Sequence, residues 1–136
     1  MARILAIDYG AKRCGLAVTD YLKISINPLK VLEPEKLVEF LQDYVKKENV
    51  DTLIIGWPTH ADGKETYLVK EIKKFLSTFA QLFPNIKIEK VDESFSSSEA
   101  KQLIWDSGVR KKKRMEKSLV DQVSAILLIK RYLDSL

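Results

Sequence analysis

The stretch of sequence that decides the fold is ARILAIDYGAKRCGLAVTD, residues 2–20. Its first part, Arg3–Asp8, is apolar and contains β-branched residues, which predicts a strand that is buried on both faces. A turn over residues 10–15 follows, and residues 16–19 return as a second strand. The two strands therefore form a hairpin whose loop is longer than the minimal two residues.

The order of the remaining elements indicates an α/β fold. Residues 24–31 predict a third strand, in which Pro28 favours an edge position. Beyond it we expect a helix opened by Glu33-Pro34-Glu35, a strand at 51–55, a helix at about 65–82, a strand at 86–91, and helices at 96–105 and 116–136. A meander followed by βαβ crossovers gives a mixed sheet with helices on both faces. This order matches the ribonuclease H-like fold, whose five strands would lie in the order 3-2-1-4-5 with the first strand central.

The composition is that of an ordinary folded domain. Hydrophobic residues make up 46% and charged residues 31% of 136 residues, which suits a single domain spanning 1–136. No apolar run approaches the roughly 18 residues that a membrane span needs, and the N-terminus lacks a signal-peptide layout. Cys14 is the single cysteine, so an internal disulfide is excluded. We therefore expect a cytoplasmic protein with no membrane partner.

Carboxylates follow the first and fifth strands, which we expect to be parallel, with the fourth strand between them. Asp8 ends the central strand, and Asp92 and Glu93 follow the strand at residues 86–91. Ligands of α/β sheets bind at the carboxyl ends of adjacent parallel strands, so these acids are expected at one edge. Structural alternatives stay open: a turn aspartate at position 8 and a helix cap at positions 92–93.

Asp121 lies on an apolar face of the last predicted helix. At about 100° per residue, it falls between Leu128 and Tyr132. Lys130 and Arg131 occupy the other side. A carboxylate on a packing face is costly unless it is paired or bound to metal. Asp121 is therefore either a metal ligand or one half of a salt bridge to a lysine or arginine.

Convergence of these acidic positions would define a metal site. Hydrolysis of a phosphodiester needs an activated water and neutralised charge, which two magnesium ions about 4 Å apart can supply. Magnesium prefers hard oxygen ligands, and manganese would fit the same oxygens.

Four blocks of the chain carry a family signature. They are residues 7–20 (IDYGAKRCGLAVTD), Gly56-Trp57-Pro58 with Asp62-Gly63, Asp92-Glu93 with Phe95-Ser96-Ser97 and Ala100, and Lys117 with Asp121, Ala125, Ile126-Leu127 and Tyr132-Leu133. In this order and spacing they resemble the YqgF family, also called RuvX, whose members are described as Holliday-junction resolvases or pre-16S rRNA nucleases. The resemblance covers essentially the whole chain.

The resemblance implies a ribonuclease H-like fold and a divalent-metal nuclease site. The family's acidic set corresponds to Asp8, Glu93 and Asp121 in this sequence, which would be the catalytic metal ligands for Mg²⁺ or Mn²⁺. Three further residues are expected to support these ligands without binding the metal: Asp92, Gly10 and Gly56.

Two departures from the family pattern bear on substrate contacts. Ser94 stands where the family usually has an arginine, and His60 stands where an asparagine is common. Neither position belongs to the acidic set. His60 is the only histidine, and a metal-activated water does not need a histidine as its base.

Positive charge is concentrated in two places. The net charge is +4, from 23 Lys+Arg against 19 Asp+Glu. Lys12 and Arg13 lie in the first turn beside Asp8 and are expected to hold a phosphate. A run of five basic residues stands between the last two predicted helices: Arg110, Lys111, Lys112, Lys113 and Arg114. We expect this run to bind nucleic acid, and a solvated turn is the alternative.

The leading hypothesis is a nuclease that processes the 5′ end of precursor 16S rRNA, as a monomer or weak dimer. The alternative substrate is branched DNA at a Holliday junction, which requires a two-fold dimer. A sugar-kinase-like or actin-like ATPase would need two lobes, and 136 residues supply one. The non-enzymatic alternative is an RNA-binding assembly or transcription factor that uses the basic run and not the carboxylates.

Overall fold

The computed structural model describes residues 2–57, 63–92 and 117–136. Within them the chain forms a five-stranded sheet in the order β3-β2-β1-β4-β5, which confirms the predicted order and the central first strand. The elements are β1 (Arg3–Asp8), β2 (Cys14–Thr19), β3 (Ile26–Leu32), α1 (Pro34–Lys47), β4 (Val50–Trp57), α2 (Gly63–Leu82), β5 (Lys87–Asp92) and α5 (Lys117–Asp134). The helix expected at residues 96–105 lies outside the described residues.

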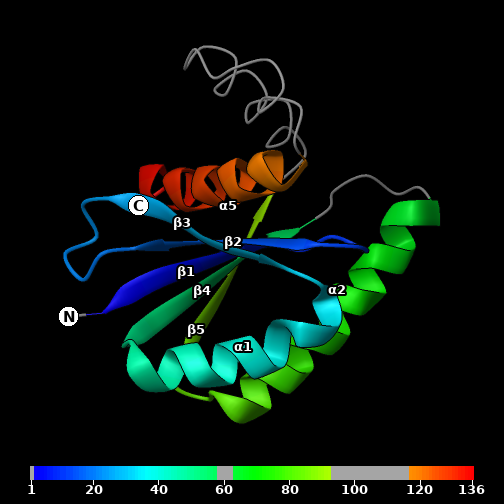
Figure 1. Ribbon diagram of the computed structural model, residues 1–136, viewed down its shortest axis with the longest axis horizontal. Coiled ribbons are helices and arrows are strands. Elements are labelled where there is room, and N and C mark those ends of the chain that lie inside the picture. Colours follow the sequence, from blue (N-terminus) through cyan, green and yellow to red (C-terminus); the bar gives the residue numbers. More distant parts are fainter. Residues whose placement is uncertain (1, 58–62, 93–116) are drawn as a thin grey trace.

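Helices cover both faces of the sheet: α5 lies on one face, and α1 and α2 lie on the other (Figure 1). The side chains of β1 alternate between these two layers. Leu5 and Ile7 are buried in the core on the α1 and α2 side, whereas Ile4 and Ala6 are buried against α5. Burial of each large aliphatic side chain contributes roughly 1.5–3 kcal/mol, which explains why the central strand is a continuous apolar run.

The parallel strands end together at one edge of the sheet. β4 pairs in parallel with both β1 and β5, and Ile7, Ile55 and Lys90 lie at one level across the three strands. Asp8, Trp57 and Asp92 are the last residues of these strands, and we call this side of the sheet the carboxyl edge. The predicted parallel arrangement of the first, fourth and fifth strands is thereby confirmed.

The first turn is shorter than the sequence predicted. Residues 10–15 were expected to form it, but Cys14 and Gly15 already belong to β2. Gly15 lies directly opposite Asp8 in the antiparallel ladder between β1 and β2. The ladder therefore continues to the last residue of β1, and only residues 9–13 connect the two strands.

The third strand begins later than predicted, at Ile26 rather than at residue 24. The Oδ1 atom of Asp20 accepts hydrogen bonds from the main-chain N–H groups of Ile24 and Ser25, at 2.7 and 3.1 Å. These local bonds hold a turn in place of ladder pairing. Pro28 has the edge position that the sequence predicted, because β3 is an outer strand.

The helices bury the apolar faces that their sequences predicted. α1 begins at Pro34, which suits the first turn because proline has no N–H to leave unpaired, and Leu37 and Leu41 are buried. Ile72 and Phe79 of α2 are buried in the same core. Among the described residues, no helix has both the length and the hydropathy of a membrane-spanning segment.

Candidate active site

Asp8 ends the central strand on the face that α5 covers. Ile4 and Ala6 of the same strand pack against α5, and a strand presents every second residue to the same face. The side chain of Asp8 therefore faces the α5 layer, at the carboxyl edge, where it is half-buried.

Gly15 lets α5 approach this position closely. Directly paired residues of antiparallel strands point to the same face, so the missing side chain of Gly15 would face α5 beside Asp8. A Cβ atom on Gly15 would lie 2.5 Å from the carbonyl carbon of Asp121 and 3.0 Å from its Cβ. From a cross-strand Cβ spacing of about 5 Å, the Cβ atoms of Asp8 and Asp121 lie within about 8 Å of each other. The fold thus brings together two of the three predicted acids.

The thiol of Cys14 lies within electrostatic reach of both carboxylates. Burial is the largest cause that raises the pKa of Cys14 to about 12, and the charges of Asp8 and Asp121 raise it further. Because the thiol stays protonated at neutral pH and is fully buried, Cys14 is a packing residue.

Asp121 forms an ion pair with Arg13. The Nε–H group of Arg13 donates a hydrogen bond of 3.2 Å to Oδ2 of Asp121, and the two side chains are 40% and 26% exposed. The sequence left two interpretations of Asp121 open, and the salt bridge to a basic residue is present. An ion pair this exposed contributes at most about 1 kcal/mol, so a divalent cation could replace it.

Three further predicted residues surround the two acids. Lys12 is exposed on the same turn as Arg13. A Cβ atom on Gly10 would clash with the main-chain carbonyl of Arg13, so this turn requires glycine. Gly56 is buried in β4, one residue beyond the level of Ile7 and therefore next to Asp8.

The remaining predicted residues are at the end of β5 or beyond the described part of the chain. Asp92 is the last residue of β5 and pairs with Trp57, so its main chain lies at the carboxyl edge as expected. Outside the described residues lie Glu93, Ser94, His60, Arg110, Lys111, Lys112, Lys113 and Arg114.

The sequence placed Gly15 in the first turn, and this placement is wrong, because Gly15 belongs to β2. The close neighbour is the main chain of Asp121 on α5. A glycine inside a strand is the pattern that could have indicated it, because such a glycine often marks close approach of another backbone.

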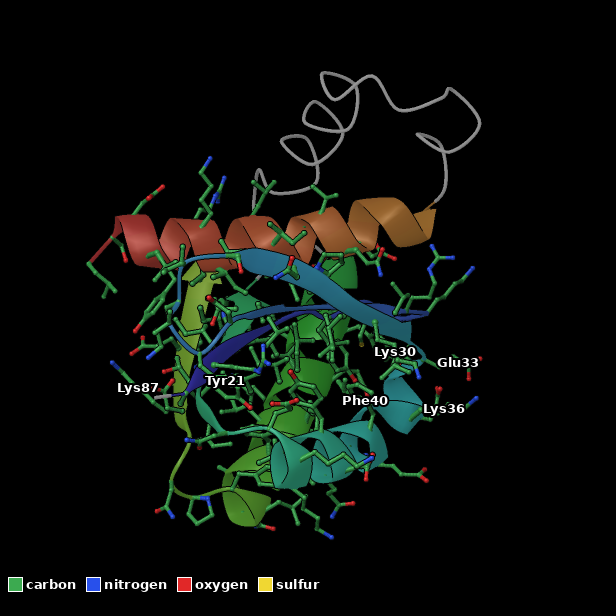
Figure 2. All side chains as sticks on the ribbon, turned by 60° about the vertical axis from the view of Figure 1, so that its left-hand side comes forward. Tyr21, Lys30, Glu33, Lys36, Phe40 and Lys87 are labelled. Atoms are coloured by element: carbon green, nitrogen blue, oxygen red, sulfur yellow. The ribbon has the colours of Figure 1, made fainter. Side chains whose placement is uncertain are left out.

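Two exposed lysines near the carboxyl edge were also missed. Lys30 and Lys36 lie with Glu33 and Phe40 at the end of the molecule where α5 begins, and Tyr21 and Lys87 lie toward the other end (Figure 2). The ammonium group of Lys30 lies 5.3 Å from the ring centre of Phe40. Lys30 and Lys36 place two positive charges at the end of the molecule where Asp8 and Asp121 lie.

The donor chemistry of the site fits a hard divalent cation. Asp8 and Asp121 offer carboxylate oxygens, which Mg²⁺ and Mn²⁺ accept. Within residues 2–57, 63–92 and 117–136, no group of three or more histidine, cysteine, aspartate or glutamate side chains is arranged to hold a metal ion. The described part of the chain thus brings two carboxylates, Asp8 and Asp121, close together as candidate ligands.

Solved structures define the class of protein. The fold is similar to that of "T. thermophilus RuvC in complex with Holliday junction substrate", with a TM-score of 0.66 and 11% identity over 99% of this chain and 96% of that one. Fowlpox virus resolvase, solved with substrate Holliday junction DNA, gives a TM-score of 0.58 and 15% identity, covering 98% and 97% of the two chains. This is a ribonuclease H-like α/β protein with the topology of RuvC.

Sequence comparison then gives the family. The family model described as "RuvX: Holliday junction resolvase" matches residues 2–135. A protein of Porphyromonas gingivalis is 45% identical over 99% of this chain and 98% of its own length. One of Christiangramia forsetii is 43% identical over 98% of each chain. Both carry the name "Putative pre-16S rRNA nuclease". The chain belongs to the RuvX family.

Proposed function

We propose that this chain is a divalent-metal-dependent nuclease that hydrolyses phosphodiester bonds in structured RNA and processes the 5′ end of precursor 16S rRNA in the cytoplasm. The observation that carries the proposal is the close contact between the main chain of Asp121 and Gly15, which is paired with Asp8 at the carboxyl edge. Membership of the RuvX family supports the reaction class, and the names of the relatives support the substrate.

Glu93 is our candidate for the third carboxylate. Val91 of β5 packs into the core beneath α5, so it faces the same side of the sheet as Asp8. Glu93 is the next residue in the sequence after β5, and the acidic set of the family corresponds to it. We therefore assign the metal-ligand role to Glu93, and a supporting hydrogen bond to Asp92.

Each part of the site has a role in cleavage. When bound, Mg²⁺ or Mn²⁺ would supply a water of lowered pKa and neutralise charge on the phosphoryl group. Asp8 and Asp121 would hold the cation, and Lys12 and Arg13 would hold non-bridging phosphate oxygens. The water oxygen would bond to phosphorus as the bond to the 3′ oxygen breaks, the water would lose a proton to solvent and the 3′ oxygen would take one up, which would leave 5′-phosphate and 3′-hydroxyl ends.

The test is a cleavage assay of a precursor 16S rRNA fragment with Mg²⁺ or Mn²⁺. We expect the wild type to cut the RNA and Asp8→Asn to lose cutting while its thermal unfolding stays close to wild type. Asp43→Asn is the matched control, because it removes an exposed carboxylate of α1 that pairs only with Lys47 among the described residues. Full cleavage by Asp8→Asn would refute the proposal.

Branched DNA is the second candidate substrate, favoured by the family description and by the RuvC-like fold. A four-way DNA junction in the same assay separates the two. Cutting of the junction with no cutting of RNA would make the chain a resolvase, and a two-fold dimer would then be required. If neither is cut but RNA is bound, the non-catalytic binding factor becomes the better description.

A further inference from the structure

The ion pair between Arg13 and Asp121 affects how the candidate site would bind a metal ion. Asp8 and Asp121 lie close together and half-buried, so their negative charges repel each other. The guanidinium of Arg13 donates to Oδ2 of Asp121 and compensates part of that charge. Arg13 therefore occupies an oxygen that the proposed metal would use.

Arg13 is able to leave this position. Its side chain is 40% exposed and projects from the turn between β1 and β2. Within the described part of the chain, Asp121 is the hydrogen-bond partner of its guanidinium. A group held by one charge-assisted bond at the surface exchanges partners at little cost.

We propose that Arg13 is the internal counter-ion of the metal site: it holds Asp121 until a divalent cation takes that carboxylate, and the released guanidinium then binds a phosphate of the nucleic acid. This inference rests on the proposed function, because it needs the metal site. A guanidinium and a metal cation repel each other, so metal binding and the Arg13–Asp121 bond exclude one another. The pair keeps metal affinity low until the substrate offers Arg13 a new partner.

The test is Mn²⁺ binding to the full chain without nucleic acid, measured by calorimetry. We expect Arg13→Gln to bind Mn²⁺ about twofold to fivefold more tightly than the wild type, the gain that loss of a weak competing ion pair allows. Arg13→Lys retains the positive charge and should bind nearly as the wild type does. Lys12→Gln is the matched control, because it removes the same charge from the same turn without touching Asp121, and it should change the affinity less.

A second measurement follows the bond itself. The Nε–H resonance of Arg13, identified by its loss in Arg13→Gln, should change position when diamagnetic Mg²⁺ is added to the wild type. Equal Mn²⁺ affinity of wild type and Arg13→Gln, with an unmoved Arg13 resonance, would overturn the counter-ion role and leave a structural cross-link. Absence of Mn²⁺ binding by both the wild type and Arg13→Gln would instead refute the metal site itself, and the inference with it.

Discussion

Two arginine–carboxylate ion pairs lie at opposite ends of the sheet. Arg3 begins β1 and bonds through Nε to Oε2 of Glu48, just after α1, at 3.3 Å. Arg13 follows β1 and bonds through Nε to Oδ2 of Asp121 on α5 at 3.2 Å. The two pairs use the same atoms at almost the same distance, so their chemistry alone does not distinguish them.

Their surroundings differ. The guanidinium of Arg3 also donates to the carbonyl of Thr19 at 2.9 Å and lies 4.3 Å from the ring centre of Tyr21. The hydroxyl of Tyr21 donates in turn to Glu48. Among the described residues, Arg3 is held by three neighbours and is expected to act as a permanent cross-link, whereas Arg13 is held by Asp121 and is proposed to exchange this partner. The number of additional partners, and not the ion pair itself, separates a structural contact from a functional one.

The largest effect should come from removing the carboxylate at the site end. We expect Asp121→Asn to lower cleavage of precursor rRNA by about 10²–10³-fold, because it removes a charge that would hold the cation at the transition state. The unfolding midpoint should change little, since the ion pair is weak. Glu48→Gln, at the other end, should cleave at the wild-type rate. Similar cleavage by the two variants would erase the distinction.

Gly15→Ala should have the next largest effect. Its new Cβ would overlap the main chain of Asp121, so α5 must move away from β2. We expect a loss of about 1–3 kcal/mol in the free energy of unfolding, typical of overpacking, measured by urea denaturation. Cleavage should fall by up to about 10²-fold, because a displacement of roughly 1 Å misplaces a catalytic group. An unchanged unfolding curve would contradict the close seating of α5.

Arg3→Gln should affect stability alone. The side chain is 21% exposed and gives up bonds to both Glu48 and Thr19. We expect the Tm to fall by about 3–5 °C, which corresponds to roughly 1 kcal/mol in a chain of this size. Cleavage per folded molecule should stay at the wild-type value. A large loss of cleavage without a change in Tm would reverse the roles assigned to the two ends.

The smallest effect is a pH dependence at the structural end. The hydrogen bond from Tyr21, and then the charge of Arg3, hold the pKa of Glu48 below its ordinary value of 4.5. A carboxyl whose pKa is depressed by folding stabilises the fold above its unfolded pKa and loses this contribution as pH falls through the folded value. The Tm difference between wild type and Glu48→Gln should therefore be constant above about pH 5 and shrink below pH 4.5. A difference that grows on acidification would contradict this sign.

The sheet could be predicted because its elements carry local patterns. The apolar run before Asp8, the proline in β3 and the helical spacing in α1 each reflect a preference of a few neighbouring residues. Strand boundaries were less accurate, since the ladder of β1 and β2 extends to Gly15 and the carboxylate of Asp20 delays β3. These two boundaries depend on hydrogen bonds that the pattern of neighbouring residues does not reveal.

The site could be predicted only in part, for a similar reason. Asp8 was predicted because it ends the central strand, and Asp121 because it is a carboxylate on an apolar face of a helix. The contact that brings the two residues together was not predicted, because it joins Gly15 to a helix near the other end of the sequence. The pairing of Arg13 with Asp121 could not be predicted either, because these two residues also lie far apart in the sequence. The metal-ligand role stays a prediction for Asp8, Glu93 and Asp121 alike.

The packing of α5 against β2 also has a consequence for the order of events during synthesis and folding. α5 is the last element along the sequence, yet it places Asp121 beside a strand made near the beginning. A ribosome synthesises the hairpin first, and contacts between distant parts of a sequence form late in folding. The proposed nuclease would therefore gain cutting activity only after α5 has been made and has docked on β2.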